Sequence, residues 1–279
     1  MRKIEVEDII RRVSDICIEV NCCLNTDVSD ALKESLDIEQ SDTGKNILAQ
    51  LIENYEIAER EMMPICQDTG MVICFVEIGQ EVYVSGNLED AINEGVRQGY
   101  EKGFLRKSVV SDPLHRKNSN DNTPAVIHYE IVPGKQLKIS IAPKGFGSEN
   151  MSALKMLKPS DGINGVVQFV VETCEKAGPN PCPPIIVGVG IGGSMEKAAL
   201  IAKKALLRPI HEKNGLPHID ELEELLLHKI NKLGIGPGGL GGKITALGVN
   251  VDIYPTHIAG LPVAVNISCH ATRHGEFTL

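Results

Sequence analysis

Cysteine, amide, carboxylate and hydroxyl side chains stand in consecutive positions in the stretch PICQDTG, as Cys66, Gln67, Asp68 and Thr69. A segment of helical periodicity precedes this stretch, and the apolar run MVICFVEIG follows it. Polar groups this dense at a helix-to-strand turn either form hydrogen bonds or do chemistry. Cys66 has no partner of the C-x-x-C kind, so any further thiolate ligand must come from elsewhere in the chain.

Two more cysteines occupy similar positions, Cys182 in NPCPP and Cys269 in SCHATRHG. Each lies where proline or the end of an apolar strand should turn the chain. Thiolate is a soft ligand that suits zinc and iron–sulfur clusters. Structural zinc usually takes four ligands, often in close pairs, and most electron-transfer clusters take four cysteines. Three separated cysteines would leave one metal position open to a substrate, with the metal acting as a Lewis acid.

The other five cysteines lie within apolar periodic patterns or close to them. Cysteine in the core of a helix or strand behaves as a small hydrophobic residue. We therefore predict a structural role for Cys17, Cys22, Cys23, Cys74 and Cys174.

Three glycine-rich stretches could bind a ligand through their main-chain groups. IIVGVGIGGSMEKAALIAKKALL resembles a dinucleotide fingerprint, but the following LLRPIHEKNGLP lacks the second strand and terminal acid that this fingerprint requires. The stretch therefore indicates either an anion at a helix N-terminus or close strand–helix packing. GIGPGGLGGK fails as a phosphate loop, because Pro237 and Ile244 stand where a glycine and a hydroxyl are needed. APKGFGSEN is the third stretch and follows an apolar strand pattern.

Composition limits the classes of protein to which this chain can belong. The chain has 279 residues, of which 42% are hydrophobic, and a net charge of −9. An acidic chain is a poor partner for nucleic acid, and no apolar run approaches the roughly 20 residues of a membrane span. The N-terminus MRKIEVEDII does not resemble a signal peptide. We expect a cytoplasmic protein with reduced cysteines and no nucleic-acid or membrane partner.

Periodicity predicts an α+β fold. Helical spacing dominates residues 1–60, and a core that mixes sheet and helix is expected over residues 61–279. In that core we predict a helix over 87–103 capped by Asn87, and a hairpin that pairs 125–132 with 136–142. Further strands are predicted at 71–79, 81–86, 184–190, 243–257 and 261–269, and further helices at 160–176, 194–207 and 218–234.

Taken together, PICQDTG, PKGFGSENMSALKMLKPSDG, CPPIIVGVGIGGSMEKAALIAKKALLRP, GIGPGGLGGKITALGVNV and YPTHIAGLPVAVNISCHATRH resemble the α subunit of the class I fumarate hydratase and L-tartrate dehydratase family. The resemblance covers about residues 45–275 in the same order. It implies an oxygen-sensitive [4Fe-4S] cluster with one open iron, held by Cys66, Cys182 and Cys269 in a cleft between loops. It also implies that Cys66 lacks a near partner because the other ligands come from distant loops.

The resemblance further implies roles for residues around that cluster. Asp68 and His257 match catalytic positions, with Asp68 orienting the catalytic base. Gln67 lies on the substrate side, and Arg106 in FLRKSVVSDPL matches an arginine that pairs with a substrate carboxylate.

One loop departs from the family's pattern. The family usually shows three consecutive glycines where this chain has Gly145, Phe146 and Gly147. We expect Gly145 and Gly147 to contact substrate through their main chain, with Phe146 altering that contact.

The resemblance implies a hydro-lyase that is active only with a β subunit, which carries the threonine base, two arginines and a lysine. The expected reaction is the reversible hydration of fumarate to L-malate, with L-tartrate as the alternative dicarboxylate substrate. A weaker alternative is a non-catalytic iron–sulfur sensor or scaffold, against which Asp68, Arg106 and His257 argue. Association of α chains with each other is also expected.

Overall fold

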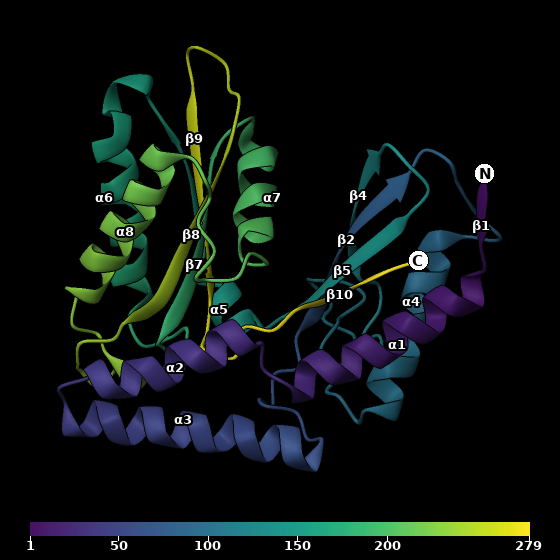
Figure 1. Cartoon of the computed structure of the whole chain (residues 1–279), viewed down its shortest axis with the longest axis horizontal. Coiled ribbons are helices and arrows are strands. Elements are labelled where there is room, and N and C mark those ends of the chain that lie inside the picture. The colour runs from purple at the N-terminus through teal and green to yellow at the C-terminus, as the bar shows by residue number, and fades with distance from the viewer. The chain divides into compact units, whose positions relative to one another are not determined.

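The computed structural model describes residues 1–279, which divide by their contacts into two compact units (Figure 1). Unit 1 consists of Met1–Asn25, Tyr55–Phe146 and Arg273–Leu279, and unit 2 consists of Thr26–Asn54 and Gly147–Thr272. The α+β class predicted from periodicity is confirmed. Both units contribute to residues 1–60, so the boundary at residue 60 stays a prediction.

Three helices account for most of the first 60 residues, as predicted. They are α1 (Val6–Cys22), α2 (Thr26–Ile38) and α3 (Asp42–Glu61). The boundary between the units falls within α3, after Asn54. No helix of the structure combines the length and the apolar character that crossing a membrane would require.

A four-stranded mixed sheet with the order β10-β5-β2-β4 forms the centre of unit 1. Strand β2 runs parallel to β4 and antiparallel to β5, which is itself antiparallel to β10. The bounds are β2 (Met71–Gly79), β4 (Val126–Val132), β5 (Leu137–Lys144) and β10 (Gly275–Thr278). A separate parallel pair joins β1 (Arg2–Ile4) to β3 (Val82–Val84).

The predicted hairpin of β4 with β5 is wrong, although both segments are strands. Strand β2 lies between them and pairs with both. The end of β2 is held there by two main-chain bonds, from Gly79 N to Gln136 O at 2.8 Å and from Gln80 N to Val132 O at 2.9 Å. The apolar β2 is almost wholly buried, so it gains a partner on each side that an edge strand would lack.

Helices α1 and α4 (Leu88–Lys102) pack on each other and on the apolar side of this sheet. The predicted cap of α4 is confirmed, because the Asn87 side chain accepts hydrogen bonds from Glu89 N at 3.0 Å and Asp90 N at 3.3 Å. Cys17 of α1 and Cys74 of β2 are fully buried in this core, as predicted for structural cysteines.

Unit 2 is a layered structure around a second four-stranded mixed sheet with the order β6-β9-β7-β8. Strand β7 runs parallel to β8 and antiparallel to β9, and β9 is antiparallel to β6. The strands are β6 (Ala153–Leu157), β7 (Ile185–Gly192), β8 (Ala246–Tyr254) and β9 (Leu261–Ser268). Besides α2 and most of α3, the helices are α5 (Phe146–Glu149), which begins in unit 1, α6 (Gly162–Ala177), α7 (Met195–Ala205) and α8 (Pro217–Asn231), with short 3-10 turns at Pro159–Asp161 and Pro237–Gly239.

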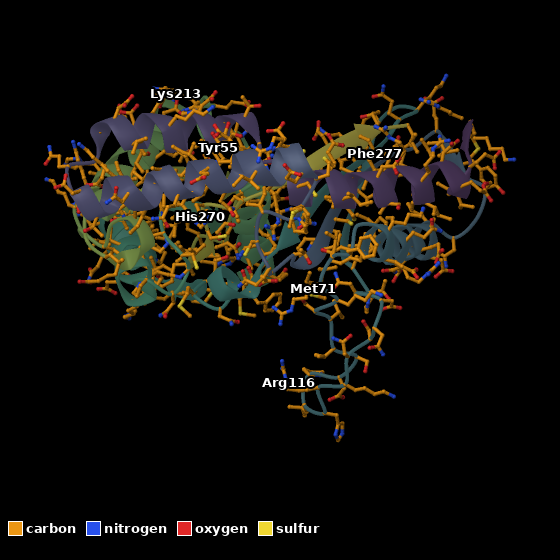
Figure 2. All side chains as sticks on the ribbon, turned by 90° about the horizontal axis from the view of Figure 1, so that it is seen from below. Tyr55, Met71, Arg116, Lys213, His270 and Phe277 are labelled. Carbon is orange, nitrogen blue, oxygen red and sulfur yellow. The ribbon has the colours of Figure 1, made fainter.

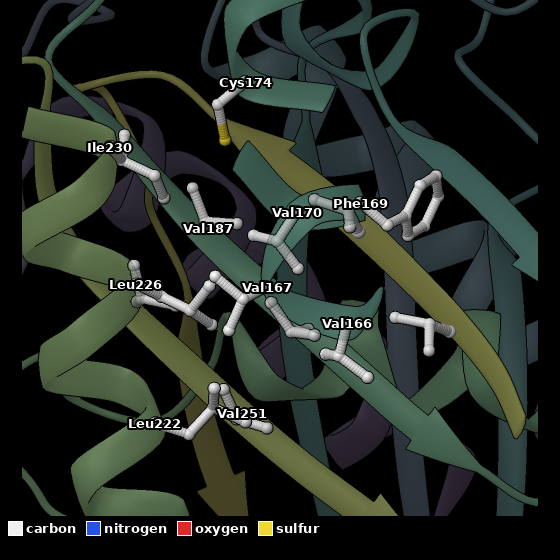
Figure 3. Close-up of a cluster of buried hydrophobic side chains, with 14 of the residues drawn as sticks. Val166, Val167, Phe169, Val170, Cys174, Val187, Leu222, Leu226, Ile230 and Val251 are labelled. Atoms are coloured by element: carbon white, nitrogen blue, oxygen red, sulfur yellow. The ribbon is translucent and has the colours of Figure 1, made fainter. Parts of the chain in front are cut away.

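Helices α6 and α8 cover one face of this sheet, and α7 covers the other (Figure 1). Figure 3 shows Leu226 of α8 and Val170 of α6 directed at Val187 of β7, with Cys174 in the same cluster. Leu226, Val170 and Val187 are fully buried. Truncating a leucine such as Leu226 to alanine would cost about 2–5 kcal/mol.

The glycines of β7 allow α7 to pack directly on the sheet. A β-carbon added at Gly188 would lie 2.1 Å from Ala202 O, and one at Gly190 would lie 2.1 Å from Ala198 O. Small residues at these positions let the helix backbone approach the strand. Of the two interpretations of this glycine stretch, close strand–helix packing therefore accounts for Gly188 and Gly190.

Candidate functional site

The PICQDTG turn of unit 1 joins the end of α3 to β2 and is anchored through its main chain. The Tyr100 hydroxyl donates to Thr69 O at 2.6 Å and to Gly70 O at 3.1 Å, and Asn122 Nδ2 donates to Gly70 O at 3.2 Å. Tyr100 and Asn122 are fully buried. Burial raises the pKa of the Tyr100 hydroxyl, so it keeps its proton and stays a donor. Two buried polar side chains thus hold this turn in place.

Asp68 is half-buried and holds two separate segments of unit 1 together. Its Oδ1 accepts from Gly70 N at 3.0 Å, and its Oδ2 accepts from Phe146 N at 2.9 Å. The Arg273 guanidinium donates to the main-chain oxygen of Asp68. The carboxylate is therefore oriented, with the Gly145–Phe146 segment fixed beside it, and each of its oxygens retains a second lone pair.

Cys66, Gln67 and Arg106 present groups that solvent can reach. The Cys66 thiol is half-buried and donates to Gln67 Oε1 at 3.3 Å. Gln67 and the Arg106 side chain are exposed. Thr69 Oγ1 donates to Arg106 O at 3.1 Å, which ties the loop after α4 to the turn. Figure 2 shows Arg116 at the far end of that loop.

In unit 2, Cys182 and Cys269 lie at the same end of the sheet. Cys269 follows the last residue of β9, and Cys182 precedes the first residue of the antiparallel neighbour β7 by three positions, with Ile186 opposite Ser268. His270 Nδ1 lies 3.1 Å from Cys182 O, so the two turns are in direct contact. Cys182 is exposed and has a φ of 56°, and Cys269 is half-buried. The structure therefore brings two of the three predicted ligands together.

Gly147 lies at this same end of the sheet. A β-carbon added to it would be 3.9 Å from Asn180 O, two residues before Cys182. Helix α5, which holds Gly147, is anchored by Glu149, whose carboxylate accepts from Lys203 Nζ and, at 3.0 Å, from Asn266 Nδ2 of β9. An ion pair and an amide thus anchor Glu149, and Gly147 lies beside the Cys182 turn.

His257 lies at the opposite end of β9. It is exposed on the connection between β8 and β9, and its Nδ1 accepts from Ala259 N at 3.1 Å. The eight residues of β9 separate this connection from Cys269. At the usual rise of a strand this is roughly 25 Å, so the fold of unit 2 does not bring His257 to Cys182 and Cys269.

The remaining cysteines differ from the three predicted ligands in burial. Burial raises the pKa of the Cys74 and Cys174 thiols to about 12 in each case, and burial likewise raises the pKa of Cys17 and Cys22. Because thiolate is the metal-binding form, these thiols are poor ligands. Cys23 is half-buried, and burial raises the pKa of its thiol as well.

The donor set fits a thiolate-ligated metal centre. Cys66, Cys182 and Cys269 lie on turns, Cys182 is exposed and the other two residues are partly exposed, and none is in a disulfide. Cys66 belongs to unit 1, whereas Cys182 and Cys269 belong to unit 2. The cleft between loops that was expected to hold the centre stays a prediction.

The residues that support these turns were not found from the sequence. Tyr100 is one of several apolar positions on α4, and Asn122 and Arg273 stand in segments without periodicity. Of these residues, only His270 could have been suspected from the sequence, because it directly follows Cys269 in SCHATRHG. Their role depends on main-chain oxygens that come close only in the folded chain.

Comparisons with known proteins agree on one family. The family model described as Fumarate hydratase (Fumerase) matches residues 10–278. A protein of Methanocaldococcus jannaschii with the provisional name L(+)-tartrate dehydratase subunit alpha is 46% identical, over 94% of this chain and 95% of its own length. The L(+)-tartrate dehydratase subunits alpha of Escherichia coli K12 and Shigella sonnei are each 35% identical, over 95% of this chain and 90% of their own lengths.

Proposed function

Since the chain belongs to the fumarate hydratase (Fumerase) family, at the length of its α subunits, we propose that it is the α subunit of a two-chain hydro-lyase. The substrate in this proposal is a small 2-hydroxy dicarboxylate. The relatives named as α subunits support the need for a β chain.

Cys66, Cys182 and Cys269 hold a [4Fe-4S] cluster in this proposal. The observation that carries it is the contact between the Cys182 and Cys269 turns, where neither cysteine is buried as those of the core are. When bound, a cluster with one open iron supplies Lewis acidity that makes the substrate hydroxyl a better leaving group. Accessible thiolates of this kind require a reducing compartment, which supports a cytoplasmic location.

Unit 1 supplies the groups that bind and orient the substrate. The exposed Arg106 guanidinium offers a planar fork to a carboxylate. Gln67 offers an amide beside Cys66, and Asp68 has a fixed carboxylate that can orient a base. Elimination breaks a carbon–hydrogen bond and the neighbouring carbon–hydroxyl bond, forms a carbon–carbon double bond, and releases the proton and the hydroxide as one water. The β chain supplies the base that takes the proton.

His257 acts, in this proposal, on a site held by a second copy of the chain. It lies a full strand length from Cys269 of its own unit, and no small dicarboxylate spans roughly 25 Å. The expected association of α chains would bring the β8–β9 connection of one copy to the cysteine turns of another.

Hydration of fumarate to L-malate is the first candidate reaction, in keeping with the family's description. Dehydration of L-tartrate is the second, and the names of the relatives favour it. The two substrates differ by one hydroxyl, so selection requires a polar group that pairs with that hydroxyl or a contact that rejects it.

The test is anaerobic reconstitution of the α chain with its co-expressed β chain, followed by parallel assays on L-malate and L-tartrate. The proposal expects about four irons per α chain and turnover of at least one substrate. A complex that binds the full cluster and turns over neither substrate would leave the sensor or scaffold as the function.

A further inference from the structure

Glu39 is a buried carboxylate whose only close polar contacts are main-chain N–H groups. It follows α2 in unit 2 and its residue is 2% exposed. Its Oε1 accepts from Gln40 N at 2.8 Å, Ser41 N at 2.9 Å and Lys243 N at 2.9 Å. Its Oε2 accepts from Lys243 N and Ile244 N, both at 2.9 Å. Successive N–H groups that converge on one point form an anion-binding site.

One of these donors, Lys243 N, ends the stretch GIGPGGLGGK, and another, Ile244 N, directly follows it. The sequence fails as a phosphate loop, yet its end binds an anion, and that anion is the chain's own carboxylate. Gly242 has a φ of 137°, and a β-carbon there would lie 2.8 Å from Glu39 Oε2. The glycine is required because the carboxylate lies against the backbone.

The same loop lies directly behind the Cys182 turn. Gly238 N donates to Pro183 O at 2.7 Å. A β-carbon at Gly239 would lie 2.3 Å from Pro179 Cβ, so the loop backbone is packed against the start of the turn. Beyond the turn, Ile185 N donates to Thr245 O at 2.9 Å, one residue after the Ile244 that binds Glu39. The loop therefore contacts the Cys182 segment on both sides of the cysteine.

We propose that Glu39 is a positioning residue for Cys182, acting through the glycine loop 236–244. Its carboxylate accepts main-chain N–H hydrogen bonds at the end of the loop, as a bound anion would, and fixes the main chain that supports the ligand turn. The part of this inference that concerns iron rests on the proposed function, while the part that concerns Cys182 does not.

Glu39→Gln is the test substitution, because it keeps the shape and replaces one acceptor oxygen by a donor that faces N–H groups. Glu34→Gln is the matched control, since Glu34 is exposed on α2, the helix that Glu39 follows. Glu39→Asp is the conservative variant, which keeps the charge on a shorter side chain and serves in its place if Glu39→Gln does not fold.

The first measurement uses the full chain without iron. Hydrogen exchange of the peptide that covers 236–244 should accelerate in Glu39→Gln, and iodoacetamide should alkylate Cys182 roughly three- to tenfold faster because the turn opens locally. Cys66 in unit 1 is the internal reference and should keep its rate. Glu34→Gln should change neither value, and Glu39→Asp should lie between Glu39→Gln and the wild type.

The second measurement uses the reconstituted complex with its β chain. A chelator should remove iron from Glu39→Gln about tenfold faster than from the wild type, a size that is typical when a group supporting a metal ligand is lost. An unchanged Cys182 alkylation rate in Glu39→Gln would overturn the inference, whether or not the loop exchanges faster. A wild-type complex that takes up no iron, with Cys182 still responding to Glu39→Gln, would refute the proposed function and leave the inference standing.

Discussion

The two ends of the unit 2 sheet differ in how firmly other residues of the unit hold their turns. At one end, the Cys182 and Cys269 turns are held by His270, by the glycine loop and by the Glu149 network. At the other end, the connection between β8 and β9 is exposed, and Ile258 beside His257 is 91% exposed. One end of the sheet is already organised within the unit, while the other presents an apolar, uncovered tip.

The difference indicates that the two ends have separate roles. Side chains that hold a metal must be positioned before it binds, because a loose ligand lowers affinity. An exposed apolar tip is typical of a surface that contacts a partner. We call the end with the Cys182 and Cys269 turns the cysteine end and the end with the β8–β9 connection the His257 end. We expect substitutions at the cysteine end to affect the chain that carries them, and substitutions at the His257 end to affect contacts between chains.

The largest expected effect is loss of the cluster from Cys182→Ser. A serine hydroxyl cannot replace the thiolate, so iron content of the reconstituted complex should fall to background. Cys174→Ser is the control, since Cys174 is buried in the core and should leave iron content unchanged. Full iron content in Cys182→Ser would contradict the assignment of ligands.

His257→Ala should lower kcat of the complex by about 10²–10⁴-fold, the usual contribution of an acid–base group. Iron content should stay the same, because His257 lies at the far end of β9. His218→Ala, an exposed histidine on α8, should have no effect on kcat.

Mixing two inactive variants tests whether His257 acts between copies. Complexes reassembled from His257→Ala and Cys182→Ser chains should recover part of the activity, since some sites then combine an intact cysteine set with an intact histidine. No recovery, despite mixed assemblies shown by mass spectrometry, would mean that His257 serves its own chain or none.

Lys203→Met should destabilise the protein more than loss of an exposed ion pair does, because Lys203 pairs with Glu149 near Cys182 and Cys269. The Lys203–Glu149 pair is largely buried, with side chains 19% and 24% exposed, so its loss should cost about 1–3 kcal/mol. The melting temperature should fall by about 2–6 °C. Lys213→Met is the matched control, because the Lys213–Glu224 pair is 68% and 71% exposed and should contribute little. Equal shifts for the two variants would show that Glu149 does not hold this end.

Acid should weaken the cysteine end through Glu39. Burial by itself would raise the pKa of Glu39, but hydrogen bonds from Ser41, Lys243, Ile244 and Gln40 N–H groups outweigh it and hold the pKa below its usual value. A carboxylate with a lowered folded-state pKa contributes stability above its unfolded pKa, about 4.3, and loses it as pH falls through the folded value. The difference in unfolding free energy between wild type and Glu39→Gln should therefore be constant near neutral pH and shrink below about pH 4. A difference that grows on acidification would contradict this.

The smallest effect on folding is expected from Ile258→Ser at the exposed tip. Surface substitutions usually change stability by less than about 0.5 kcal/mol, so the melting temperature should stay nearly constant. Self-association, measured by analytical ultracentrifugation, should weaken because the tip loses its apolar contact. Unchanged association would remove this tip from the interface between copies.

Local patterns in the sequence were sufficient for most helices and strands. The strand predicted over 71–79 is β2, and the Asn87 cap and the buried positions of Cys17, Cys74 and Cys174 are confirmed. These features depend on neighbouring residues, because periodicity and capping act within a few positions. Strand β10, with four residues and one buried side chain, was too short to show such a pattern.

Part of the candidate site could be predicted in the same way. Cys66, Cys182 and Cys269 stand out because each follows or precedes a strand at a turn. Their supporting residues could not be found, since Tyr100 and Asn122 bind main-chain oxygens about 30 and 50 positions away in the chain. Hydrogen bonds of this kind leave no periodic trace in the sequence.

The sequence alone determined most of the elements, the turns that carry Cys66, Cys182 and Cys269, and the glycine-rich stretches. Only the tertiary structure decided that β2 separates β4 from β5, that His257 and Cys269 stand at opposite ends of β9, and that Glu39 binds the glycine loop. The physical reason is the distance along the chain over which each kind of interaction acts. Periodicity reports which face of a segment is buried, whereas strand order and a carboxylate that meets N–H groups over 200 positions away depend on how distant segments pair once the chain has closed on itself.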